Sequence, residues 1–155
     1  MTDDVLIRRA TAADAEALAG LSSQLGYPAT PEAIVARLAV SAGQSHRSVF
    51  VACLPGGAVA GYIDLGVIQH LQSDAHVDIQ GLVIDSAARN RGIGVRLLEQ
   101  AEAWAKTHNV ATIRVRSNVI RTDAHRFYER EGYIREKTSA VFRKSVGGGS
   151  GVERS

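Results

Sequence analysis

The chain has 155 residues, of which 45% are hydrophobic and 22% charged, with a formal net charge of +2. These values fit one globular domain and exclude a disordered chain. Lys and Arg form no long run, no stretch of 18 apolar residues exists, and the only cysteine is Cys53, so we expect no nucleic-acid partner, no membrane span and a cytoplasmic location.

The first half of the chain predicts one strand, two helices and a hairpin. Apolar residues at three-and-four spacing mark the two helices, and Thr30 followed by Pro31 is typical of a helix start. The turn Pro55-Gly56-Gly57 between two apolar runs is a hairpin signal. In chain order, we expect a strand over 5–8, helices over 12–25 and from 31, and strands over 48–54 and 58–68.

The second half predicts a strand–helix–strand unit, which should be parallel and right-handed. It is followed by a short helix capped by Gly132 and by two final strands. The expected ranges are a strand over 76–84, a helix over 94–105, a strand over 110–115, a helix over 124–128, and strands near 133–135 and 139–143. The fold class is therefore a mixed α/β arrangement. We expect a single domain over 1–145 and a flexible Gly-rich tail over 146–155.

The most informative segment is 81–95, where an apolar strand runs into a polar loop and a helix begins at a glycine pair. Free N–H groups at a helix start bind phosphate, and Gly92 and Gly94 carry no side chain that blocks the backbone. Arg89 and Arg91 add positive charge at the same place. Together these residues predict a pyrophosphate-binding site.

Other interpretations of this loop fit less well. A Walker loop needs Gly-Lys-Ser/Thr, which the sequence lacks. A dinucleotide fingerprint has a third glycine where Leu97 stands, and an acidic residue where the next strand carries Arg114 and Arg116. A glycine-rich loop that only makes a tight turn stays an alternative, which the two neighbouring arginines weaken.

Two motifs in order resemble the Gcn5-related N-acetyltransferase (GNAT) superfamily. Arg89-x-x-Gly92-x-Gly94 resembles its R/Q-x-x-G-x-G/A signature, and the segment from Ala124 to Tyr133 is similar to its A-x-x-F-Y-x-x-x-G-F/Y segment. The resemblance covers roughly residues 5–143. It departs where many members carry asparagine, since Arg121 stands there and Asn118 lies three residues earlier.

The resemblance implies a GNAT-like fold, with six to seven strands in a mixed sheet, splayed central parallel strands and about four helices. It also implies acetyl-CoA as co-substrate, with its pantetheine arm along the strand that ends at Ile84 and its pyrophosphate at the following helix start. The amine would attack the thioester directly, without an acetyl-enzyme. The cofactor-binding residues so implied are Leu82, Val83, Ile84, Arg89, Arg91, Gly92, Ile93, Gly94 and Val95.

Proton transfer needs two further groups. Tyr128 matches the family position that often carries the acid for the leaving thiolate; a core aromatic beside Phe127 is the alternative. Asp78 is the candidate base for the amine, and a solvated edge carboxylate is the alternative. The acceptor should enter near Tyr27, between the first two helices. His70 and His76 lack further ligands nearby in sequence, so we expect no metal.

The expected activity is therefore transfer of acetyl from acetyl-CoA to a primary amine of a small molecule or peptide. The alternative from another class is a CoA-binding sensor or partner module without turnover. A nucleotide-binding domain is a third hypothesis. Exposed strand edges allow a homodimer, which the sequence does not determine.

Overall fold

The computed structural model describes residues 4–117 and 121–147. Asn118 lies outside these ranges. The chain divides into two compact units, Met1–Arg116 and Ser117–Ser155, each with its own internal contacts. The expectation of one domain over 1–145 with a tail over 146–155 stays a prediction. Within the described ranges, no helix has the length and apolar character that crossing a membrane requires.

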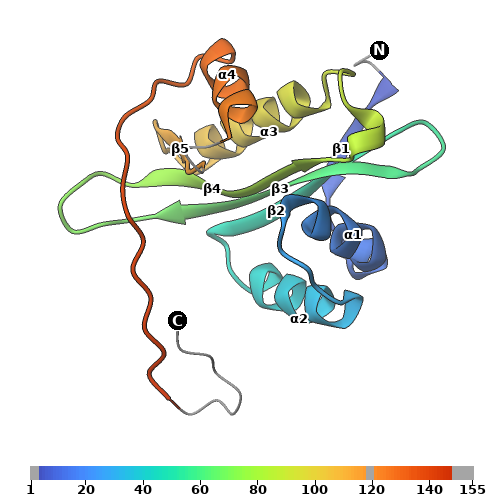
Figure 1. Ribbon diagram of the computed structural model, residues 1–155, viewed down its shortest axis with the longest axis horizontal. Coiled ribbons are helices and arrows are strands. Elements are labelled where there is room, and N and C mark those ends of the chain that lie inside the picture. The colour runs from blue at the N-terminus through green and yellow to red at the C-terminus, as the bar shows by residue number, and fades with distance from the viewer. Residues whose placement is uncertain (1–3, 118–120, 148–155) are drawn as a thin grey trace. The chain divides into compact units, whose positions relative to one another are not determined.

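The first unit contains a five-stranded sheet in the order β1-β2-β3-β4-β5 (Figure 1). The neighbours are antiparallel except for β4 and β5, which are parallel. The predicted mixed sheet and its parallel strand–helix–strand unit are thus confirmed. The strands are β1 (Leu6–Arg9), β2 (Arg47–Cys53), β3 (Val59–Ile68), β4 (His76–Ile84) and β5 (Ile113–Val115).

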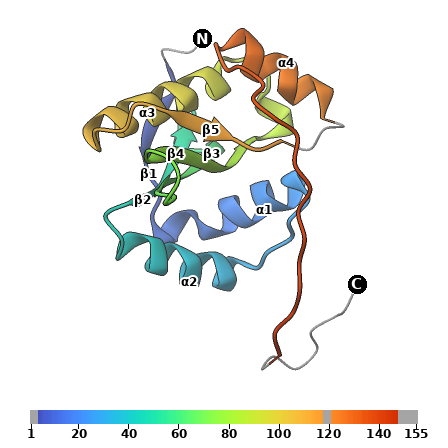
Figure 2. The same cartoon turned by 90° about the vertical axis from the view of Figure 1, so that its left-hand side faces the viewer.

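Helices cover both faces of this sheet. α1 (Ala15–Leu25) and α2 (Pro31–Ala42) lie on one face, and α3 (Ile93–Thr107) lies on the other (Figures 1 and 2). The apolar stripe predicted for α3 is buried as expected, because its side chains recur on one side of the helix. The buried residues of α3 are Ile93, Gly94, Leu97, Leu98, Ala101, Trp104 and Ala105.

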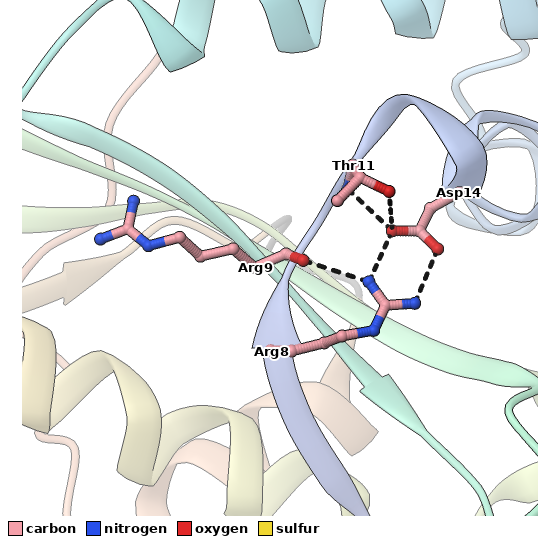
Figure 3. Close-up of polar contacts among 4 residues, drawn as sticks. All are labelled: Arg8, Arg9, Thr11 and Asp14. Atoms are coloured by element: carbon pink, nitrogen blue, oxygen red, sulfur yellow. Dashed lines mark hydrogen bonds and ion pairs between the residues drawn. The ribbon is translucent and has the colours of Figure 1, made fainter.

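A buried carboxylate fixes the passage from β1 into α1. Arg8 donates from both terminal nitrogens to Asp14, at 2.9 Å each, and the Thr11 N–H donates to the same carboxylate at 2.8 Å (Figure 3). Asp14 ends a 3₁₀ turn, Ala12–Asp14, directly before α1. The bidentate pair therefore ties the first strand to the start of the first helix.

A β-bulge interrupts β4 at the point where its pairing with β5 ends. Asp64 of β3 pairs with Gly81 and the next residue with Ile79, so Gln80 is an extra residue in β4. The last pair between β4 and β5 joins Ile79 to Val115. Residues 80–84 of β4 therefore run on beyond the last pair that β4 makes with β5. The splay of these strands that the resemblance implies stays a prediction.

The second unit holds α4 (Thr122–Arg130), which ends as predicted before Gly132 at φ 94°. The two strands predicted near 133–135 and 139–143 were wrong, because residues 133–147 form no strand. The described part of the chain thus has five strands rather than six or seven. A strand exists only with a pairing partner, and the described residues of the second unit contain no other strand. Large apolar side chains here are exposed, among them Ile134, Val141, Phe142 and Val146.

Candidate active site

Beyond Ile79, the far half of β4 pairs with no described strand on the side of β5. The Asp85 N–H donates to Ala60 O on β3 at 2.8 Å. Successive backbone groups on a strand alternate in direction, so the N–H and C=O of Leu82 and Ile84 point away from β3. This edge can pair with an extended ligand as an added strand would. Val83, between them, has a buried side chain and points its backbone toward β3.

Directly after β4 lies the turn that the sequence predicts to bind phosphate. A 3₁₀ turn, Ser86–Ala88, leads to Gly92, which caps α3 at φ 73° and ψ 14°, a conformation that favours glycine. Gly92 O accepts the first helical bond, from the Arg96 N–H at 3.1 Å. The N–H groups of Ile93, Gly94 and Val95 precede that bond and have no partner inside the helix. The helix dipole adds positive potential at this end.

Two arginines flank this turn. The side chains of Arg89 and Arg91 are exposed, and neither forms an ion pair with another described residue. α1 holds the turn from the other side, because Gln24 accepts from the Ser86 N–H at 3.0 Å and donates to Asp85 at 3.3 Å. The predicted cofactor-binding residues are thus brought together along one strand end and one helix start.

A cavity of about 310 Å³ opens on the α1 and α2 face of the sheet. Tyr27, predicted to contact the acceptor, lies at this cavity with 70% of its surface exposed. Ser22 holds the loop in place by donating to Tyr27 O at 2.6 Å. The cavity is lined by Leu18, Ser22, Leu25, Tyr27, Ile34, Arg37, Leu38, Ser41, Arg47, Val49, Tyr62, Asp64 and Gln80.

Three charged side chains of this lining were missed by the sequence analysis, namely Arg37, Arg47 and Asp64. Arg47 on β2 donates to Asp64 on β3 at 3.0 Å. Burial raises the pKa of the Asp64 carboxyl above its ordinary value, against the opposing effect of Arg47. The signal in the sequence was a lone aspartate inside the apolar strand 59–68, a position where a carboxylate is rare without a partner.

Asp78, the predicted base, is buried and close to two basic side chains. Its carboxylate lies 3.8 Å from Arg116 Nη1 and 4.0 Å from His76 Nε2. Burial lowers the pKa of His76, so this imidazole is neutral at neutral pH. Asp78 does not line the cavity, although its charge contributes to the raised pKa of Asp64. The alternative of a solvated edge carboxylate does not describe Asp78.

Tyr128, the predicted acid, belongs to the second unit. Its ring lies in an aromatic group, 5.4 Å from the Phe127 ring centroid and 5.8 Å from that of Tyr133. Burial raises the pKa of the Tyr128 phenol above its ordinary value, and the positive charge of Arg121 opposes this effect. The hydroxyl therefore keeps its proton at physiological pH.

The two histidines considered for a metal site stack on each other, with ring centroids 5.8 Å apart. Within 4–117 and 121–147, no group of three or more His, Cys, Asp or Glu side chains is arranged to hold a metal ion. Cys53 is buried in β2, as a small apolar strand residue would be.

Comparison with known proteins finds acetyltransferases. The profile of the acetyltransferase (GNAT) family matches residues 16–133. The chain is 32% identical to the aminoalkylphosphonate N-acetyltransferase of Salmonella typhimurium over 133 residues, which cover 82% of this chain and 83% of that protein.

Solved structures share the fold. A protein of Bacillus halodurans described as a transcriptional regulator superposes with a TM-score of 0.81 at 25% identity, covering 90% of this chain and 99% of that one. The aminoglycoside N-acetyltransferase AAC(6')-Iy, solved with a CoA-containing bisubstrate analogue, superposes with a TM-score of 0.79 at 19% identity, covering 91% and 98%. With the open edge of β4, the glycine-capped helix start and the family match, the chain belongs to the acetyltransferase (GNAT) family and is an N-acetyltransferase enzyme.

Proposed function

We propose that this enzyme moves the acetyl group of acetyl-CoA to a primary amine of a small molecule or peptide, by direct attack within a ternary complex. The observation that supports this most is the open edge of β4 leading directly to the unpaired N–H groups of α3. The pantetheine arm would pair with Leu82 and Ile84, and the pyrophosphate would lie on residues 91–95. Arg89 and Arg91 would neutralise its charge.

The bound ammonium loses one proton, and the neutral nitrogen forms a bond to the acetyl carbon. A backbone N–H of β4 stabilises the oxyanion of the tetrahedral intermediate. The carbon–sulfur bond breaks, Tyr128 gives its proton to the thiolate, and the nitrogen releases its second proton, which returns through solvent to the Tyr128 phenolate. The products are the N-acetyl amine, CoA and one net proton, with no acyl group on the protein.

Tyr128 is tested by removing its hydroxyl. We expect Tyr128→Phe to lower kcat by ~100-fold while the KM for acetyl-CoA stays unchanged, because only proton donation is lost. Release of the CoA thiol measures turnover. Tyr133→Phe removes a hydroxyl from the neighbouring ring and should keep kcat within about twofold of wild type. A Tyr128→Phe enzyme with unchanged kcat would refute the acid role.

The pKa of Tyr128 gives this test a pH signature. Because burial raises that pKa above the ordinary value of 10.0, the phenol stays protonated throughout the neutral and mildly alkaline range. The acid should therefore limit kcat only above about pH 10, where the hydroxyl loses its proton.

Asp78 stays the proposed base, acting on the amine through water. The support is its position on β4, two residues before the open edge begins. Arg116 and His76 lie close to its carboxylate. A base role requires that Asp78→Asn lower kcat/KM most at low pH, where the amine is fully protonated. A uniform loss at all pH values would instead assign Asp78 a structural role.

A further inference from the structure

The cavity proposed for the acceptor is small, and its lining reaches the bulge of β4, where the pairing of β4 with β5 ends. Its volume of about 310 Å³ is near the lower end for ligand sites, which suits a ligand of few heavy atoms. Gln80, the bulged residue of β4, forms part of its lining. The acetyl group would be delivered beside this residue, since the open edge begins there.

Gly66 provides the space in which this floor is built. A side-chain carbon at Gly66 would lie 3.1 Å from Gln80 Nε2 and 3.3 Å from Arg47 Cδ. The glycine thus allows both side chains to lie over β3 at the cavity. Arg47, Asp64 and Gln80 all line the cavity.

A single hydrogen bond joins Arg47 to Asp64. Only Oδ1 of Asp64 and one terminal nitrogen of Arg47 take part in their hydrogen bond. Arg47 Nε is buried and has no hydrogen-bond partner among the described residues. Oδ2 of Asp64 likewise accepts no hydrogen bond from them. Asp64 Oδ2 is therefore left without a partner among the described residues, on a side chain that is 28% exposed.

The charge of the cavity lining favours amines that carry an acid group over amines with several positive charges. Arg37 of α2 is exposed at the cavity and forms no ion pair with a described residue. With Arg37 and Arg47 against Asp64, two positive charges meet one negative charge. Such a lining repels a polycation and attracts an anion. An aminoglycoside carries several positive charges, whereas an aminoalkylphosphonate joins one amine to an acid.

We propose that the acceptor is a short zwitterion, an amine joined through a few carbons to a phosphonate or carboxylate. Arg37 and Arg47 bind the acid group, and Asp64 receives the ammonium before it loses its proton. This inference rests on the N-acetyltransferase function proposed above and names the acceptor class. Guanidinium groups suit planar or tetrahedral oxyanions because they donate two hydrogen bonds in a fixed geometry.

A matched series of acceptors tests the proposal. 2-Aminoethylphosphonate, β-alanine and propylamine place the same amine on a two-carbon chain that ends in a phosphonate, a carboxylate or a methyl group. Spermidine represents the polycations. We expect kcat/KM of at least one acid to exceed that of propylamine and spermidine by tenfold or more. The preferred acid identifies the group that the arginines bind.

Variants then locate the recognition. Arg37→Gln should raise the KM for the preferred acid about tenfold and leave propylamine unchanged, because Arg37 contacts only the acid group. Arg9→Gln removes another exposed guanidinium of the same unit, one outside the cavity lining, and should change neither. Preference for propylamine or spermidine, or an acid KM that Arg37→Gln leaves intact, overturns the proposal.

Calorimetry separates this inference from the function on which it rests. The acceptors are titrated into the enzyme loaded with CoA. If the acids bind, propylamine does not, and no amine releases thiol from acetyl-CoA, then the proposed acetyl transfer fails while the zwitterion site stands. If amines are acetylated without regard to their acid group, the function stands and the zwitterion site fails.

Discussion

At the scale of single residues, Asp14 shows how one buried side chain links structure to pH. The hydrogen bonds from Arg8 lower the pKa of this carboxyl below its ordinary value of 3.8, with the Thr11 N–H acting in the same direction. The charged form is therefore the one that the fold stabilises. Its contribution to stability is complete above the unfolded pKa and is lost as the pH falls through the folded pKa.

Replacing Asp14 tests this contribution. Asp14→Asn should lower the free energy of unfolding by about 2 kcal/mol at pH 7, because the charge-assisted bonds from a half-exposed arginine are lost. Denaturant titration measures the change, and the difference from wild type should shrink below pH 4. Glu99→Gln, which removes a partly exposed carboxylate 3.8 Å from Arg96, is the control and should cost less than ~0.5 kcal/mol. Equal losses for both variants would contradict the assignment.

The cavity on the α1 and α2 face is lined by one residue that the sequence predicted and by others that it did not. Tyr27 was predicted to lie where the acceptor enters, because the loop between two helices was recognised, and it lines the cavity. Arg47 and Asp64 were not predicted, since their contact depends on the register between β2 and β3. In that register Asp64 pairs with Val49, which places Arg47 on the diagonal. Nothing in the local sequence specifies that pairing.

At the scale of elements, the start of α3 depends on the left-handed conformation of Gly92. Alanine at this position costs roughly 1–2 kcal/mol, since its Cβ approaches the carbonyl group in that conformation. Gly92→Ala should therefore shift the first turn of α3 and weaken CoA binding about tenfold, because the N–H groups move.

A second glycine supplies the matched control for this prediction. Gly56 has φ 96° in the turn between β2 and β3, and a side-chain carbon there would meet nothing within 4 Å. Gly56→Ala should cause a similar loss of stability and no loss of CoA affinity. Calorimetric titration of CoA with both variants measures the difference. Equal affinities would show that the helix start does not bind the diphosphate.

The elements also show where hydrophobic patterns succeed and fail. The stripe of α3 was predicted residue by residue because a helix makes its own hydrogen bonds and needs only one apolar side. The strand ending at Ile84 was predicted with its bounds, because burial along most of its length makes its sequence largely apolar. The two final strands were wrong because alternation favours an extended chain without providing a neighbour to pair with.

At the scale of the whole molecule, binding of the co-substrate should appear as resistance to heat. A ligand at 100 times its Kd adds about 2.7 kcal/mol to the stability of the native state. For a chain of this size, CoA should raise the Tm by roughly 5–10 °C. ATP and NAD at the same concentration should raise it by less than about 2 °C, and differential scanning calorimetry measures all three. A larger shift with NAD would favour a dinucleotide site.

The bulge at Gln80 has a consequence for any attempt to shorten β4. Near the start of β4, the N–H of the odd-numbered Val77 points away from β3 and donates to Thr112 O. Beyond the bulge, the N–H of the odd-numbered Asp85 points toward β3, so the even-numbered N–H groups point away from it. With every residue kept and the irregularity straightened, the backbone groups of Leu82 and Ile84 would turn toward β3. The edge proposed to pair with the pantetheine arm would then be lost. Deleting Gln80 alone would preserve those directions but remove the bend. A single extra residue thus decides which backbone groups of β4 lie on the side away from β3.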